Sequence, residues 1–289
     1  MAELMLGKEV NASLNEKIKA NVEALKQKGV VPGLGIVRVG ENPGDLSYEK
    51  GAVRKCETLG ISCRRFLLPK DVSEKELLAV IEMLNNDDLI HGVLLFRPLP
   101  KHLRSSVIEN ALAPEKDVDC MTELSMAGVF TGKKIGFPPC TPQGCMEILD
   151  YYGVDCTGKK AVVIGRSLVV GRPAAMMLMD KNATVTICHS RTVDLPSVTR
   201  EADILIVAAG QAGMIGADHV RKGQVVIDVG INVTGEGMLC GDVDYQAVEP
   251  IVSAITPVPG GAGSVTTTVL AGHVVEAAMR REESALKEK

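Results

Sequence analysis

Apolar residues recur with two different periods along the first third of the chain, and this pattern predicts alternating helices and strands. Gly29 is expected to end a helix whose apolar face consists of Val10, Leu14, Ile18, Val22 and Leu25. The elements expected after it are a strand at 33–39, a helix at 47–59, a strand at 62–68, a helix after the capping box Ser73-x-x-Glu76, and a strand at 92–96. Such alternation is typical of a mostly parallel sheet.

The same alternation continues in the second half of the chain. The expected elements are a helix at 140–149, strands at 161–164, 184–188, 204–208 and 225–229, a Pro- and Gly-rich loop at 256–263, and a last helix with Leu270, Val274 and Ala277 on one face. With 289 residues, the chain is long enough for two domains. We therefore expect an α/β domain over residues 1–138, to which the helix of 266–289 returns, and a Rossmann-type domain over residues 139–265.

The composition restricts the kinds of protein that fit this pattern. Hydrophobic residues make up 46% of the chain, with no Trp, four Phe and four Tyr, so the core has to consist of aliphatic side chains and Met. A net charge of −4 argues against a nucleic-acid or anionic-membrane surface, and no apolar run approaches the ~20 residues of a membrane span. The N-terminus lacks a signal-peptide pattern, and eight scattered cysteines are expected to be reduced thiols without a metal site. These features favour a cytoplasmic enzyme.

The most informative local pattern lies in residues 158–192, GKKAVVIGRSLVVGRPAAMMLMDKNATVTICHSRT. An apolar run ends at Gly165, a short loop leads to Gly171, and Pro173 starts an apolar helix that a second strand follows. This order is typical of a dinucleotide site, where the helix N-terminus offers N–H groups to phosphate. The glycines alone also fit a turn without a nucleotide, because they read G-x-S-x-x-x-G and not G-x-G-x-x-G.

The residues after the second strand indicate which dinucleotide would bind. An NAD site places Asp or Glu there for the ribose 2′-hydroxyl, whereas this chain has Ser190 and Arg191. An Arg suits a 2′-phosphate, so the pattern predicts NADP as the cofactor. A single Arg is also a common solvated surface charge, and that interpretation stays open.

Eight motifs resemble one known family when they are taken together and in order: ENPGDLSY, the PLP of FRPLP, EKDVD, PCTPQG, VVIGRSLVVGRP, HSRT, VIDVGIN and ITPVPGG. Over roughly residues 30–280 the chain resembles the methylenetetrahydrofolate dehydrogenase/methenyltetrahydrofolate cyclohydrolase (FolD) family. The resemblance implies two α/β domains flanking a cleft, a homodimer, and a place in one-carbon metabolism and purine biosynthesis. It also implies oxidation of 5,10-methylenetetrahydrofolate by NAD(P)+, followed in many members by hydrolysis of the methenyl product to 10-formyltetrahydrofolate.

The resemblance assigns roles to individual residues. The catalytic folate-site residues fall on Tyr48 and on Asp119, whose carboxylate suits the N–H donors of a pterin. Without the resemblance, the pattern favours Tyr48 as a half-buried residue at a helix start, and Asp119 would equally be a turn residue. Further substrate contacts fall on the turn of Pro259, Gly260 and Gly261. The expected cofactor contacts are Gly165, Arg166, Ser167, Gly171, Ser190, Arg191 and Ile231.

Two departures from the family pattern concern the hydrolytic step. Bifunctional members carry Y-V-x-x-K and V-Q-L-P-L-P, but here the Lys position holds Ala52 and the Gln position holds Phe96. Hydride transfer needs alignment and no obligatory protein base, whereas hydrolysis needs general acid–base catalysis. The family assigns that task to the Lys–Gln pair, and neither Ala52 nor Phe96 can perform it. Two smaller changes are Cys120 for a Gly and Ser264 for a Pro.

The sequence therefore predicts an NADP-dependent methylenetetrahydrofolate dehydrogenase whose cyclohydrolase activity is weak or absent. Lys55 shares a helix face with Tyr48 but lies two turns away, Lys50 lies on another face, and Arg97 holds its proton too firmly to act as a base. Three alternatives stay open: a fully bifunctional enzyme with another base, a folate- or nucleotide-binding protein without turnover, and another two-domain NADP dehydrogenase such as a shikimate-type enzyme.

Overall fold

The computed structural model describes residues 2–235 and 237–287 and divides into two compact units. The six-stranded unit comprises Met1–Ala12 and Thr141–Thr266, and the three-stranded unit comprises Ser13–Cys140 and Thr267–Lys289. Each contains a parallel sheet with helices, which confirms the predicted α/β class. The first twelve residues were expected in the other domain; they belong to the six-stranded unit because β1 (Glu3–Leu4) pairs with β11 (Ala254–Ile255). No described helix has the length and apolar character needed to cross a membrane.

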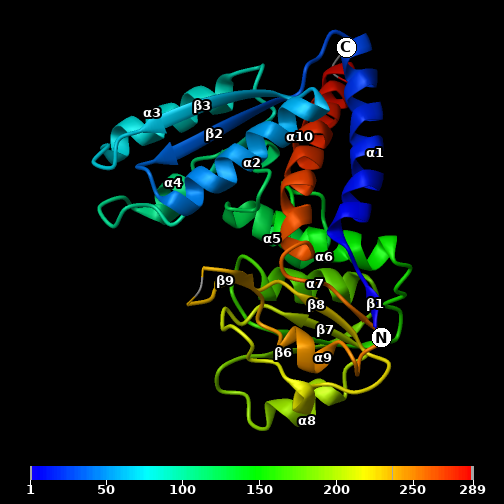
Figure 1. Ribbon diagram of the computed structural model, residues 1–289. Coiled ribbons are helices and arrows are strands. Elements are labelled where there is room, and N and C mark those ends of the chain that lie inside the picture. The colour runs from blue at the N-terminus through cyan, green and yellow to red at the C-terminus, as the bar shows by residue number, and fades with distance from the viewer. Residues whose placement is uncertain (1, 236, 288–289) are drawn as a thin grey trace. The chain divides into compact units, whose positions relative to one another are not determined.

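The sheet of the three-stranded unit has β2 (Gly33–Val39) between β3 (Ser62–Leu68) and β4 (Gly92–Leu95), all parallel. Helix α2 (Pro43–Leu59) connects β2 to β3, and α3 (Glu74–Asn86) connects β3 to β4 (Figure 1). The shorter helices that follow are α4 (Ser105–Glu109), the 3-10 turn η1 (Pro114–Lys116) and α5 (Glu123–Thr131). One face of the sheet packs Val37, Val93 and Leu95 against Leu77 and Ile81 of α3, as the two-residue period of a strand requires.

The sheet of the six-stranded unit has the order β1-β11-β8-β7-β5-β6, with every pair parallel. Its remaining strands are β5 (Lys160–Ile164), β6 (Thr184–Cys188), β7 (Ile204–Val207) and β8 (Val225–Asp228), and a hairpin adds β9 (Asn232–Val233) and β10 (Leu239–Cys240). Its short helices are α7 (Gly171–Asp180), α8 (Leu195–Arg200), η2 (Ala217–His219) and α9 (Tyr245–Val248). Helices α1 (Gly7–Gln27), α6 (Cys140–Tyr151) and α10 (Ala262–Lys287) each contain a unit boundary.

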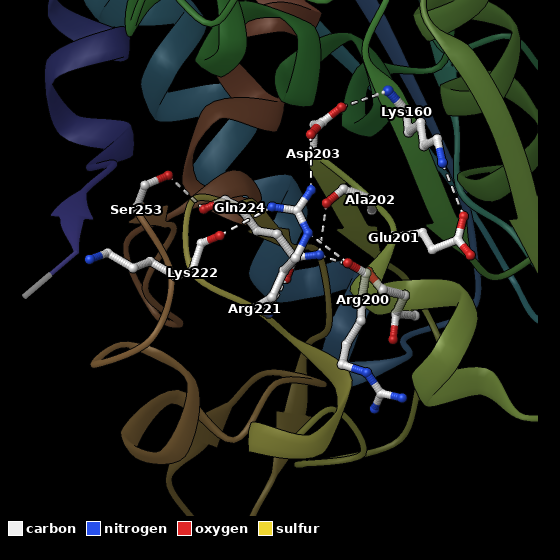
Figure 2. A network of polar contacts seen from close by, with 10 residues as sticks. Lys160, Arg200, Glu201, Ala202, Asp203, Arg221, Lys222, Gln224 and Ser253 are labelled. Carbon is white, nitrogen blue, oxygen red and sulfur yellow. Dashed lines mark hydrogen bonds and ion pairs between the residues drawn. The ribbon is translucent and has the colours of Figure 1, made fainter.

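The amino ends of the central strands are tied together by polar contacts (Figure 2). Asp203, just before β7, accepts the backbone N–H of Lys160 at 3.0 Å and pairs with Arg221 Nη2 at 3.0 Å. Gln224, just before β8, is buried and donates to the Ala202 carbonyl at 2.9 Å. These groups satisfy one another, so ligand chemistry is expected at the opposite, carboxyl end of the strands, where open α/β sheets bind ligands.

Candidate active site

The turn after β5 lies where the strand order changes direction, between β5 and β7. Gly165 has a φ of +120°, and a Cβ added there would overlap the carbonyl oxygen of Ala208, which follows β7. A Cβ added to Gly171 would overlap the Gly165 carbonyl. Both positions require glycine because the backbone segments approach too closely for a side chain. The predicted glycine turn is therefore present at a switch point, the usual place of a nucleotide.

Ser167 organises the loop between the two glycines. Its hydroxyl oxygen accepts the N–H groups of Val170 at 3.0 Å and Gly171 at 3.4 Å, and its carbonyl accepts that of Arg172 at 3.1 Å. The first N–H groups of α7 are therefore already bonded, contrary to the expectation that they are free for phosphate. Because a hydroxyl keeps its own proton while it accepts, Ser167 can still donate to a phosphate. Ser167 and its neighbour Arg166 are both exposed.

Ser190 and Arg191 follow β6, and both are exposed. The Arg191 N–H donates to the ring Nδ1 of His189 at 3.1 Å, and the Thr192 N–H donates to the His189 carbonyl at 2.9 Å, so the two side chains project from a tight turn. Within the described ranges, the guanidinium of Arg191 forms no ion pair with a carboxylate. Its charge is thus available to an anionic ligand.

Ile231 and the glycine loop before α10 lie close together in the six-stranded unit. Ile231 is 66% exposed, and a Cβ added to Gly263 would come within 3.2 Å of its Cδ1 atom. Gly260 has a φ of +102°, and a Cβ added to Gly261 would overlap the backbone of the same loop. The structure therefore brings Ile231 beside the predicted Pro259–Gly261 turn, which needs its glycines for conformation and close approach.

Asp228, at the end of β8, supports these loops and was not a predicted site residue. Its carboxylate accepts the N–H groups of Gly230 at 2.9 Å, Asp242 at 3.0 Å and Val243 at 2.9 Å. Burial raises the pKa of Asp228 to about 6, while the three N–H groups oppose the rise. Asp228 belongs to the VIDVGIN motif, but the letters alone do not show that its carboxylate binds backbone.

Helix α2 carries Tyr48 and is fixed in place by its ends and by the ion pairs of Glu49, the longer of which joins Oε1 to Arg65 Nη1 of β3 at 3.6 Å. Asn42 caps its start, and Gly60, with a φ of +77°, ends it. Glu49 forms a buried ion pair with Arg38 of β2, with 2.7 Å between Oε2 and Nε. Because Glu49 is the next residue after Tyr48, this pair fixes the part of the helix from which the Tyr48 ring projects.

Tyr48, Phe96 and Asp119 come together in the three-stranded unit. The rings of Tyr48 and Phe96 meet edge to face, with 5.9 Å between centroids and 84° between planes. Burial raises the pKa of Tyr48, and the nearby Cys140 and Asp119 raise it further. Tyr48 and Phe96 are therefore in contact, and the charge of Asp119 is near enough to raise the pKa of Tyr48.

Asp119 is held by the start of α6. Its Oδ1 accepts the Cys140 N–H at 2.9 Å, and burial raises its pKa. The Cys140 thiol donates to the Val118 carbonyl at 3.3 Å, and Nδ1 of the buried His273 lies 2.9 Å from the same oxygen. The PCTPQG motif points to this segment, but neither Cys140 nor His273 was a predicted site residue. Cys120 has a φ of +56°, which is the region where the family's Gly would be unstrained.

Ala52 occupies the position of the missing lysine and is fully buried, one helical turn after Tyr48. Lys55 lies further along α2, where its Nζ is 3.4 Å from Asn15 Oδ1 of α1 and burial lowers its pKa. Lys50 is exposed. Arg97, beside Phe96, has its Nη1 3.9 Å from Glu109 Oε2. None of these cations therefore takes over the position that Ala52 occupies.

Comparison with known proteins agrees with this arrangement over nearly the whole chain. Residues 139–282 match the tetrahydrofolate dehydrogenase/cyclohydrolase NAD(P)-binding domain, and residues 5–119 match the catalytic domain of the same family. The chain is 54% identical over 280 residues to the bifunctional protein FolD of Carboxydothermus hydrogenoformans, covering 96% of this chain and 97% of that protein. It is 50% identical to the FolD protein of Clostridioides difficile, covering 95% and 96%.

Two solved structures extend the similarity to the fold. The bifunctional FolD enzyme of Campylobacter jejuni has a TM-score of 0.95 at 41% identity, covering 97% of this chain and 100% of the other. The Trypanosoma brucei methylenetetrahydrofolate dehydrogenase-cyclohydrolase, solved with NADP cofactor and an inhibitor, has a TM-score of 0.91 at 30% identity, covering 97% and 98%. Both comparisons cover the two units described above.

Proposed function

Because the chain belongs to the tetrahydrofolate dehydrogenase/cyclohydrolase family, we propose that it oxidises 5,10-methylenetetrahydrofolate to 5,10-methenyltetrahydrofolate with NADP+ and hydrolyses the product weakly or not at all. The first half follows from the family and from the cofactor turn. The second half depends on one observation, the pair of Ala52 and Phe96. Both are buried, and neither side chain has an atom that can donate, accept or exchange a proton.

The six-stranded unit fits a bound NADP by its own features. Gly165 and Gly171 let backbone segments approach where side chains would clash, as a pyrophosphate turn requires. Ser167 and Arg166 supply side-chain donors for phosphate. Arg191 is exposed at the end of β6 and suits a 2′-phosphate, which a guanidinium binds by charge-assisted hydrogen bonds. The cofactor, when bound, supplies the acceptor for a hydride.

The three-stranded unit supplies the predicted contacts to the folate. The carboxylate of Asp119 would accept the amino and ring N–H groups of a pterin, and the Tyr48 ring would order the flat ligand. The Cys140 N–H keeps one oxygen of Asp119 in place, and Glu49 fixes the helix that carries Tyr48. In the six-stranded unit, the turn of Pro259 to Gly261 is proposed to contact the same substrate.

The dehydrogenase step requires no acid or base catalysis by these side chains. As a C–H bond of the methylene bridge breaks, the hydride leaves and the lone pair of the adjacent folate nitrogen forms a C=N bond, so the product carries the positive charge. No proton has to be removed by the protein. Alignment is therefore the main contribution of Tyr48 and Asp119, and well-oriented reactants alone can account for a large share of a rate enhancement.

The hydrolytic step, in contrast, requires proton transfer to and from groups near the substrate. Water has to lose a proton as it attacks the methenyl carbon, and a folate nitrogen has to gain one as the ring opens, which is general acid–base work. Ala52 offers a methyl group at the position of the base, and Phe96 offers an apolar ring at the position of the amide. The rate of hydrolysis on this protein should therefore be close to the rate in water.

Full bifunctional activity is the second candidate, because the relatives at 54% and 50% identity are named bifunctional proteins. Lys55 is its most plausible base, since burial lowers the pKa of this amine toward the range where a lysine can accept a proton. However, Lys55 lies beside Asn15 of α1, at 3.4 Å. Under this alternative, a Lys55→Ala variant would lose hydrolysis and keep the dehydrogenase activity.

A spectroscopic assay of the wild-type protein separates the two candidates. With methylenetetrahydrofolate and NADP+, the absorbance of NADPH and of the methenyl group should rise together. After the reaction is stopped by exhausting NADP+, the methenyl absorbance should decay as in buffer without enzyme. A decay that is much faster and proportional to enzyme concentration would contradict the loss of cyclohydrolase activity, and absence of NADPH production would contradict the dehydrogenase assignment.

We also propose that the protein is a homodimer, as the family resemblance implies. The hairpin of β9 and β10 supports a partner surface, because it exposes the apolar side chains Val233 (67%) and Leu239 (49%). Light scattering coupled to size-exclusion chromatography should give twice the chain mass of 30.7 kDa. The single-chain mass at assay concentrations would contradict this proposal.

A further inference from the structure

We propose that Asp242 is a positioning residue of the cofactor site, which acts by fixing the loops after β7 and β8. Asp242 is fully buried and follows β10. It would not touch the nucleotide, because its carboxylate is used by the backbone and side chain of two neighbouring loops. The inference rests on the proposed NADP site and names a residue that the cofactor motifs do not include.

The first loop held by Asp242 follows β7. Its Oδ2 accepts the N–H groups of Ala209 at 2.7 Å and Gly210 at 2.8 Å. The preceding residue, Ala208, donates its N–H to Ile164 of β5 at 2.8 Å, and its carbonyl is the group that excludes a side chain at Gly165. The Asp242 carboxylate therefore fixes the backbone surface against which the glycine turn packs.

The second loop follows β8 and carries Ile231. The side chain of Asn232 donates to Asp242 Oδ1 at 2.9 Å. On the other side of Ile231, a Cβ added to Gly230 would overlap the carboxyl group of Asp242. Asp242 thus binds the residue after Ile231 and packs closely against the residue before it, whose N–H is held by Asp228, while the Ile231 side chain itself stays exposed. This arrangement is typical of a supporting residue: Asp242 would position Ile231 for contact with the cofactor and would not itself touch the cofactor.

Asp242 is itself held rigidly and connects to the glycine loop before α10. Its N–H donates to Asp228 Oδ1 at 3.0 Å, and its carbonyl accepts the Ile215 N–H at 3.0 Å. The Asp228 N–H in turn donates to the Thr256 hydroxyl at 2.8 Å, at the start of the loop that contains Gly260. Three predicted cofactor or substrate segments are therefore linked through two buried residues, Asp228 and Asp242.

The test compares Asp242→Asn with Asp244→Asn in the full-length protein. Asp244 is a matched control because it lies two residues away and carries the same charge, but its side chain caps α9 through the Ala247 N–H at 3.2 Å. The readouts are the Kd for NADPH from nicotinamide fluorescence, the KM values for NADP+ and methylenetetrahydrofolate, and the Tm. The Asp242→Asn amide turns a donor toward donors, so Kd and KM for the cofactor should rise by about tenfold or more.

For Asp242→Asn we expect the KM for the folate to stay within about twofold, and for Asp244→Asn we expect both KM values to stay within about twofold. A second variant, Asn232→Ala, keeps the carboxylate and removes one donor, so it tests the inference even where Asp242→Asn does not fold. Its Kd for NADPH should rise by about threefold. Unchanged cofactor affinity in Asn232→Ala or in folded Asp242→Asn, with only the Tm lowered, would overturn the inference. Failure of the wild-type protein to bind NADPH would instead overturn the proposed cofactor site.

Discussion

The candidate cofactor site and the candidate folate site are built in different ways. The cofactor site consists mainly of backbone, with glycines at 165 and 171 and loops tied to the carboxylates of Asp228 and Asp242. The folate site consists mainly of individual side chains, namely Tyr48, Phe96 and Asp119. The backbone that carries these side chains is held in place by other residues, as α2 is by Glu49.

This difference explains why the two sites carry different information. A backbone site fails when one glycine gains a side chain, so its pattern has to remain readable in the sequence. A side-chain site can lose one chemical group and keep its shape, as the fully buried Ala52 shows in an intact α2. The backbone requirement is therefore readable as a glycine pattern, whereas the reactions that the protein performs depend on individual side chains of the second site.

The largest expected effect tests whether the cofactor site depends on backbone approach. Gly165→Ala places a Cβ against the Ala208 carbonyl at a φ of +120°, so the turn has to move and NADPH affinity should fall by at least about 100-fold. Fluorescence titration with NADPH measures this. Gly153→Ala is the matched control, because Gly153 has a φ of +66° with open space around it; it should lower the Tm slightly and leave the affinity unchanged. Equal NADPH affinities of the two variants would contradict the conclusion that the cofactor site depends on close approach of the backbone.

The folate site should be most sensitive at Asp119. Asp119→Asn replaces an acceptor oxygen with a donor amide, so kcat/KM for methylenetetrahydrofolate should fall by about 10²–10³-fold while the Kd for NADPH stays the same. Burial raises the pKa of Asp119, so the wild-type kcat/KM should fall with decreasing pH at a higher pH than for an exposed Asp, because protonation removes the acceptor. The variant should lack this limb of the profile. A parallel loss of NADPH binding would mean that the two sites are not separable in this way.

The hydrolytic function should be recoverable by side chains alone. Ala52→Lys together with Phe96→Gln should raise methenyltetrahydrofolate hydrolysis by about 10²-fold, since that is the lower range of general acid–base catalysis. The single variant Phe96→Gln provides the control, because it loses the Tyr48 contact without gaining a base. Methenyl decay at fixed enzyme concentration is the measurement. No increase in the double variant, with dehydrogenase activity retained, would show that the missing pair is not the cause.

The smallest expected effect concerns the one side chain on which cofactor choice depends. Arg191→Ala should reduce the preference for NADP+ over NAD+ by about tenfold, the typical contribution of a charge-assisted hydrogen bond. The ratio of kcat/KM values for the two cofactors measures it. Arg166→Ala serves as the control, since a pyrophosphate contact is common to both cofactors and its loss should weaken them equally. An unchanged ratio in Arg191→Ala would return Arg191 to the class of solvated surface charges.

The strands of both main sheets could be predicted closely from the sequence. Residues 33–39, 62–68 and 184–188 are strands as expected, because apolar or alternating runs bounded by turns are strong local signals. Four strands of two residues each, β1, β9, β10 and β11, could not be predicted: they are too short for a local pattern, and β1 and β11 exist only through pairing with distant segments. For the same reason, the grouping of the first twelve residues with the six-stranded unit was missed.

The site was predictable where a motif fixes both residue type and conformation. Gly165 and Gly171 are examples, since their contacts leave no alternative residue. Ser167 was predicted as a contact, but its bonds to the first N–H groups of α7 were not, because a serine side chain has several equivalent partners nearby. Asp242 and Cys140 were missed because the groups that they bind are distant in the sequence. Ala209 lies 33 residues from Asp242, and Asp119 lies 21 residues from Cys140.

The contact between the rings of Tyr48 and Phe96 has a consequence for metabolism under the proposed function. At the position where bifunctional members carry an amide, this protein presents an apolar ring that packs against Tyr48. The methenyl cation would then leave the protein as a free intermediate instead of being processed in place. Production of NADPH and production of formyl groups could then be regulated separately, because a second catalyst would carry out the hydrolysis.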